Sequence, residues 1–107
     1  MNKFGLPERT VNELLEYFKS KPEVEKVMVY GSRAKGNFKN GSDIDFAVWL
    51  DEKSVKMGKT AYDLRIEAEL DDLDTPYMFD VTDYNNLTHT GMKQSIDRDG
   101  VLFYEKN

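Results

Sequence analysis

The chain has no cysteine and only one histidine in its 107 residues. A disulfide framework and a thiolate metal site are therefore excluded, because both need cysteine. The single histidine, His89, has no serine or cysteine arrangement around it, so we interpret it as a surface or capping residue and not as a catalyst.

The sequence also lacks a long hydrophobic run and a signal-peptide pattern, which predicts a cytoplasmic protein with no membrane contact. An excess of positive charge is missing as well, since the net charge is −5. Direct binding to nucleic acid is not expected, because it needs a basic face. A small phosphate ligand is still compatible with this balance, because Arg33, Lys35 and Lys39 form a local basic patch.

The hydrophobic content of 39% and the charged content of 33% are typical of a globular protein, and we expect a single domain over residues 1–107. Hydrophobic periodicity predicts an α+β (mixed α/β) fold, a small mixed sheet with helices packed on it. The expected helices span residues 7–19, 55–73 and 87–97, and the expected strands span 24–30, 43–50, 77–83 and 101–104. The last strand is expected at a sheet edge, where a homodimer through unpaired backbone groups is left open.

The periodicity also assigns faces to these elements. In the strand 43–50 the core face is expected to carry Ile44, Phe46, Val48 and Leu50, and the opposite face Asp43, Asp45, Ala47 and Trp49. We expect Trp49 to pack against a neighbouring element. The inner stripe of the second helix is expected to hold Met57, Ala61, Leu64, Ala68 and Leu70, and that of the third Leu87, Met92 and Ile96.

A Gly-Ser pair follows the apolar strand 24–30 directly. Gly31 has no Cβ, so the backbone can turn sharply there and another group can come close. Ser32 adds a hydroxyl beside free N–H groups at the expected start of a helical turn. Such a turn can seat a phosphate, because the first N–H groups of a helix lack partners.

Two carboxylates open the next strand. Asp43 and Asp45 are two residues apart, so their side chains leave the same face of the strand. Like charges this close repel unless a cation lies between them, and carboxylates are ligands that Mg²⁺ prefers. The pattern therefore indicates phosphoryl or nucleotidyl transfer assisted by a divalent metal. The alternative is structural: Asp43 caps a turn and Asp45 pairs with Arg33.

Two later carboxylates are treated differently. Asp80 has apolar residues on both sides, so we expect it to be a buried charge that needs a partner or a metal. Asp83 begins a turn-like Asp-Tyr-Asn-Asn segment, so we interpret it as a cap or a solvated residue.

Here the sequence resembles a known family. The pattern Gly31-Ser32-x10-Asp43-x-Asp45 is similar to the signature of polymerase-β-like nucleotidyltransferases, and residues 31–36 and 42–48 resemble their minimal nucleotidyltransferase (MNT) branch. The resemblance implies the polymerase-β-like fold and Mg²⁺ as cofactor. It implies that Asp43, Asp45 and Asp80 are catalytic and bind metal, and that the nucleotide contacts Gly31, Ser32, Arg33 and Lys35.

The same resemblance implies a partner. Small MNT proteins commonly pair with a helical HEPN protein in toxin–antitoxin systems, and some transfer AMP from ATP, the expected nucleoside triphosphate, to a tyrosine of that toxin. This chain is therefore expected to be such an adenylyltransferase. The alternative is a catalytically silent subunit that neutralises or scaffolds the HEPN partner by binding. A third interpretation, modification of a small molecule such as an aminoglycoside, is disfavoured because those enzymes usually carry an added helical domain.

Overall fold

The computed structural model describes residues 5–36, 43–51, 59–73 and 75–106. For residues 59–64 and 86 it describes the backbone only. Within these ranges a sheet of four strands has the order β3-β2-β1-β4. The strands are β1 (Val24–Tyr30), β2 (Ile44–Leu50), β3 (Phe79–Asp83) and β4 (Val101–Glu105). β1 is antiparallel to both β2 and β4, whereas β2 and β3 are parallel. The predicted mixed sheet, with its last strand at an edge, is confirmed.

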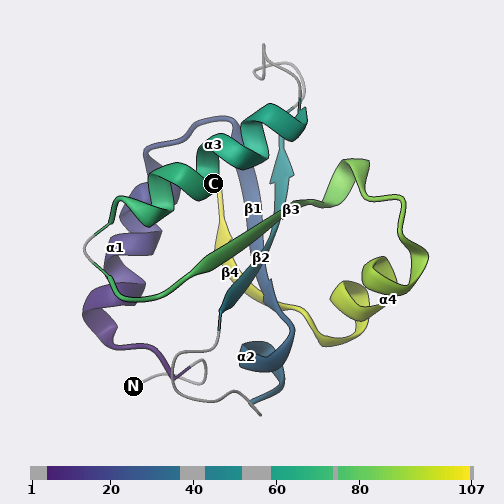
Figure 1. Ribbon diagram of the computed structural model, residues 1–107, viewed down its shortest axis with the longest axis horizontal. Helices are drawn as coiled ribbons and strands as arrows, with labels where there is room; N and C mark the ends of the chain where they lie inside the picture. The colour runs from purple at the N-terminus through teal and green to yellow at the C-terminus, as the bar shows by residue number, and fades with distance from the viewer. Residues whose placement is uncertain (1–4, 37–42, 52–58, 74, 107) are drawn as a thin grey trace.

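Two helices cover one face of the sheet (Figure 1). They are α1 (Glu8–Lys19) and α3 (Lys59–Asp71). Their apolar side chains, among them Phe18 and Leu70, share one core with the inward side chains of β1 and β2. All four residues predicted for the core face of β2 are buried: Ile44, Phe46, Val48 and Leu50. The alternation in the sequence therefore gave the correct face of this strand.

The opposite face is covered only in part (Figure 1). Helix α4 (Thr90–Asp99) lies there and buries Ile96 against Tyr30 and Ala47. The short helices α2 (Ser32–Lys35) and η1 (Tyr84–Asn86) follow the ends of β1 and β3. None of the helices within the described ranges is long and apolar enough to cross a membrane.

Two of the predicted helix faces are partly wrong. Leu70 is buried as predicted, but Ala68 is exposed, because α3 turns Ile66 toward the core in its place. Met92 is 37% exposed, since α4 starts only at Thr90 and meets the sheet near its other end, at Ile96. Met57 and the side chains predicted at 61 and 64 lie outside the described residues.

Candidate active site

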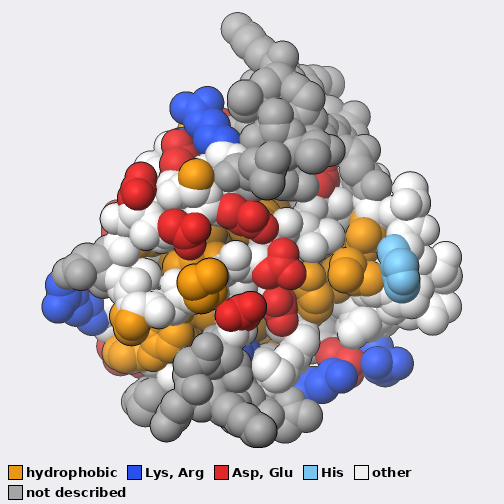
Figure 2. All heavy atoms as spheres, viewed as in Figure 1, with side chains coloured by type: hydrophobic (Ala, Val, Ile, Leu, Met, Phe, Trp, Pro, Cys, Tyr) orange, Lys and Arg blue, Asp and Glu red, His pale blue; other side chains and the backbone are white. Residues whose placement is uncertain are grey.

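Three carboxylates meet on the open face of the sheet. Asp45 is the register partner of Tyr30 on β1 and of Asp80 on β3, so the three residues form one row across three strands. Register partners project from the same face of a sheet. Asp43 directly precedes β2 and lies close enough for its charge to act on Asp45. Figure 2 shows acidic side chains gathered at the centre of the side of the molecule that Figure 1 views.

Asp45 is the member of this group whose pKa departs most from its ordinary value. Its pKa is raised from 3.8 to about 6, first by burial and then by the negative charges of Asp80 and Asp43. All three causes disfavour the ionised carboxylate, whereas an ion pair with Arg33 would favour it. Burial and like charge account for this shift, and an ion pair with Arg33 is not among its causes.

The donor set fits a hard cation by its chemistry. Carboxylate oxygens suit Mg²⁺, and a cation between the three acids would relieve the repulsion that raises the pKa of Asp45. In the described part of the chain no group of three Asp, Glu, His or Cys side chains is close enough to hold a metal ion on its own. The carboxylates thus form an open arrangement rather than a closed cage.

Asp80 does not have the environment that its sequence neighbours predicted. It is exposed and not buried, because β3 alternates and turns Phe79 and Val81 toward the core while Asp80 faces the site. The same alternation buries Asp83, which is 5% exposed and accepts a hydrogen bond from the Asn85 N–H at 3.1 Å. Asp83 therefore has the capping role that was one of its two predicted alternatives. The other alternative, a solvated side chain, is wrong.

Gly31 brings the turn after β1 against the acids. Its φ of +74° lies in the region that favours glycine, and a Cβ built there would stand 2.4 Å from Asp45 Oδ2. Any other residue would clash with the carboxylate. Ser32 begins α2 directly after this contact and is half-buried. The Gly-Ser turn and the acidic row are therefore direct neighbours, as the sequence predicted.

The two basic residues of the turn differ in their surroundings. Arg33 is only 2% exposed, and its guanidinium carbon lies 5.1 Å from the centre of the Tyr77 ring. Lys35 is exposed, with Nζ 3.7 Å from Asp99 Oδ2, and Arg98 holds the same carboxylate at 3.0 Å. The sequence did not mark Tyr77 or Asp99 as neighbours of this turn, because both come from distant parts of the chain.

His89 has the capping role that was predicted for it. It is the N-cap residue of α4, where its Nδ1 accepts a hydrogen bond from the Met92 N–H at 3.0 Å.

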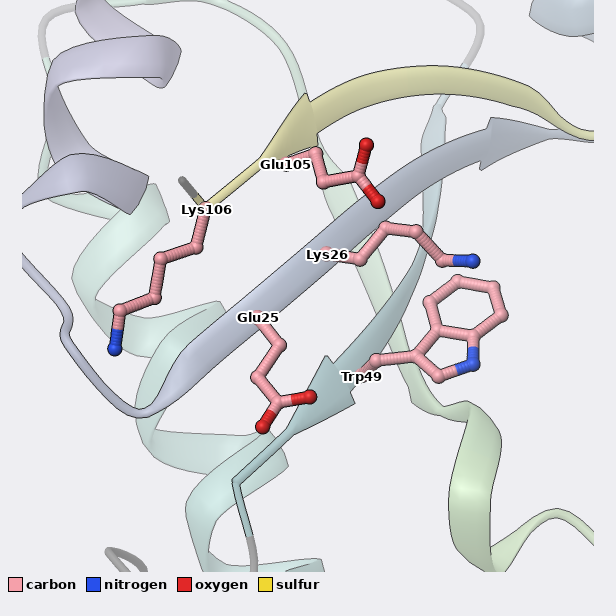
Figure 3. Close-up of a pocket in the computed structure, with 5 residues that line it drawn as sticks. All are labelled: Glu25, Lys26, Trp49, Glu105 and Lys106. Carbon is pink, nitrogen blue, oxygen red and sulfur yellow. The ribbon is translucent and has the colours of Figure 1, made fainter.

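An open hollow of about 360 Å³ lies away from the acids, at the far end of β2 (Figure 3). Its lining comprises Glu25, Lys26, Trp49, Glu105 and Lys106. Lys26 Nζ stands 4.3 Å from the centre of the Trp49 ring, which stacks on Tyr84 at the same separation. The prediction that Trp49 packs against a neighbouring element is confirmed. We do not place the active site in this hollow, because Asp45 lies four residues away from Trp49 along β2.

Comparison with known proteins gives a consistent assignment. The sequence pattern of the family described as "Polymerase beta, Nucleotidyltransferase" matches residues 12–107. No curated protein matches the chain in sequence.

Solved structures with a similar fold include three toxin–antitoxin assemblies. A toxin–antitoxin with AMP-PNP aligns with a TM-score of 0.61 at 20% identity, over 95% of this chain and 76% of that one. The toxin–antitoxin MntA–HepT aligns with a TM-score of 0.64 at 18% identity, over 94% and 74%. A tri-AMPylated Shewanella oneidensis HEPN toxin in complex with MNT antitoxin gives 0.64 at 18% identity, over 92% and 72%.

Proposed function

Since the chain belongs to the polymerase-β nucleotidyltransferase family, we propose that it transfers AMP from ATP to a tyrosine hydroxyl of a HEPN-type partner, with Mg²⁺ as cofactor, and so acts as an antitoxin. The observation that carries this proposal is the row that pairs Asp45 with Asp80, beside Gly31. A catalytically silent scaffold has no need of a carboxylate whose pKa is raised by burial and by two like charges.

Each residue of the site has a role in this proposal. Asp43 and Asp45 would hold Mg²⁺, which would neutralise phosphate charge when bound. Gly31 and Ser32 contact the β- and γ-phosphates. Arg33 and Lys35 supply positive charge to the same turn, Arg33 from beneath it and Lys35 from solvent.

The transfer is an in-line displacement at the α-phosphorus. The acceptor hydroxyl oxygen forms a bond to the α-phosphorus, the bond from that phosphorus to the bridging oxygen breaks, and pyrophosphate leaves. The hydroxyl proton passes to Asp80, which is exposed and so can meet an acceptor from a second protein.

The structural neighbours support the choice of nucleotide and partner. One of them was solved with AMP-PNP, and another pairs an MNT antitoxin with an AMPylated HEPN toxin. Their identity to this chain is 20% and 18%, so the likeness shows the fold and the function is our proposal.

The test uses the helical product of the gene adjacent to this one, incubated with the purified protein, Mg²⁺ and ATP labelled in the adenine or the α-phosphate. We expect label on the partner, and none with Asp43→Ala. Asp72→Ala, an exposed acid at the end of α3, is the matched control and should transfer label like the parent. ATP binding without any transfer would refute the enzymatic proposal.

A second candidate is a silent subunit that neutralises the partner by contact. It is favoured by the open arrangement of the acids, since no described group of three could hold a metal alone. Asp43→Ala decides between the two candidates: full silencing of the partner by this variant would show that catalysis is unnecessary.

A further inference from the structure

Asp80 lies on the most weakly supported strand of the site. β3 has five residues, and in the described sheet it is an edge strand with β2 as its strand neighbour. Backbone groups on the outer side of an edge strand have no ladder to hold them. Pairing with β2 holds the inner side of β3, and side-chain contacts add to this on its outer side and on its face.

One such contact comes from α3. The Val81 N–H donates a hydrogen bond of 2.8 Å to Glu67 Oε1 on this helix. Val81 is the residue directly after Asp80, so the bond fixes the backbone beside the acid from the outer edge. A hydrogen bond to a charged acceptor is stronger than one between neutral groups.

A second contact reaches β3 across the open face of the sheet. Tyr30 and Thr82 share a hydrogen bond of 3.1 Å between their hydroxyl groups, although β2 lies between their strands. Thr82 is the register partner of Ala47, and Tyr30 packs against that alanine. The small side chain at 47 leaves the phenol ring room to cross β2.

We propose that these two contacts form a β3 clamp, in which Glu67 holds Val81 from the edge and Tyr30 holds Thr82 from the face, and that the clamp positions Asp80 for proton removal. The two residues that follow Asp80 in β3, Val81 and Thr82, are thereby tied to α3 and to β1. Glu67 and Tyr30 are positioning residues in this proposal, since they act through the backbone and side chain that follow Asp80. This inference rests on the proposed function.

The clamp has a specific kinetic consequence. In the proposed function Asp80 acts on the acceptor hydroxyl, whereas Gly31 and Ser32 contact the triphosphate and Asp43 and Asp45 would hold Mg²⁺ beside it. A small displacement of Asp80 should therefore slow transfer and leave nucleotide binding unchanged. A general loss of structure would weaken both, which separates positioning from a merely structural role.

The test compares Glu67→Ala with Glu67→Gln in the full chain. Glutamine keeps a carbonyl oxygen that can accept from Val81 but removes the negative charge, and alanine removes both. We expect Glu67→Ala to lower kcat about 10-fold, the size of effect that a misplaced catalytic group produces, with Kd for a non-hydrolysable ATP analogue within about 2-fold of the parent. Glu67→Gln should recover most of the lost kcat.

Tyr30→Phe gives an independent variant if Glu67→Ala fails to fold, because it removes one hydroxyl and keeps the ring. We expect a fall in kcat of about 3- to 10-fold, the equivalent of one hydrogen bond, and Tyr30→Phe combined with Thr82→Val should fall no further. Hydrogen exchange at the Val81 amide should be faster in Glu67→Ala than in Glu67→Gln.

Equal kcat in the parent, Glu67→Ala and Tyr30→Phe would overturn the inference, as would a parallel loss of kcat and analogue binding. A parent protein that binds the analogue but transfers nothing would instead refute the proposed function, and the inference with it.

Discussion

Replacing Asp45 by asparagine should make the metal-free protein more stable at neutral pH. The pKa of Asp45 is raised from 3.8 to about 6 by burial and by the charges of Asp80 and Asp43. A shift of this size corresponds to at most about 3 kcal/mol of unfavourable free energy in the ionised state. Asp45 is only half-buried, so solvent screening reduces the expected gain for Asp45→Asn to about 1–2 kcal/mol.

The pH dependence of this gain has a definite sign. Between pH 3.8 and about 6 the folded protein binds more protons at Asp45 than the unfolded chain does, so stability falls as the pH rises. The cost of Asp45 is complete above pH 6 and absent below pH 3.8. The advantage of Asp45→Asn should accordingly be full at about pH 7.5 and fall to about one-third of that at about pH 4.5.

Urea unfolding with a chelator present, followed at both pH values, measures this difference. Asp72→Asn is the matched control, because it removes one negative charge from an exposed site and should change stability by less than about 0.5 kcal/mol. If Asp45→Asn is no more stable than the parent at neutral pH, or if its advantage is the same at both pH values, the electrostatic account of the site is wrong.

Four further results are expected. Mn²⁺ should raise the melting temperature of the parent and not that of Asp45→Asn, as measured by differential scanning fluorimetry. Gly31→Ala should cost about 1–3 kcal/mol in urea unfolding, because its Cβ would stand 2.4 Å from Asp45 Oδ2 and φ is +74°. Phe18→Ala should cost about 3–5 kcal/mol in the same assay, since Phe18 is fully buried and packs edge-on to the ring of Phe46. His89→Ala should cost about 1 kcal/mol through the lost cap on the Met92 N–H, with AMP transfer to the partner unchanged.

Local patterns in the sequence were sufficient for most of the fold. The alternation in 43–50 identified the core face of β2, because a strand repeats every two residues and one face is fully buried. The Gly-Ser turn was recognisable for a related reason. A glycine directly after an apolar strand indicates a conformation or a close approach that other residues cannot reach, and Gly31 has both.

The burial of charged residues and of small residues was harder to predict. Arg33 was expected to contact the nucleotide, and nothing in the sequence indicated that it is almost fully buried beside the ring of Tyr77. Tyr77 is far from Arg33 in the sequence, so no local pattern could reveal this contact. The prediction that Ala68 faces the core was wrong for a similar reason. A small residue fits either face of a helix, and only the packing of α3 against the sheet decides between the two faces.

Asp80 shows both what the sequence predicts and which burial it does not predict. Its membership of the site could be proposed from a resemblance, but its burial was misjudged, because apolar neighbours on both sides look alike in a covered strand and in a half-exposed edge strand. Only the parallel register that sets Asp80 beside Asp45 decides which face it takes, and that register joins segments 35 residues apart. A family signature can therefore name the third acid, while the contacts that hold it, from Glu67 and Tyr30, belong to this chain and become visible only when the strands are paired.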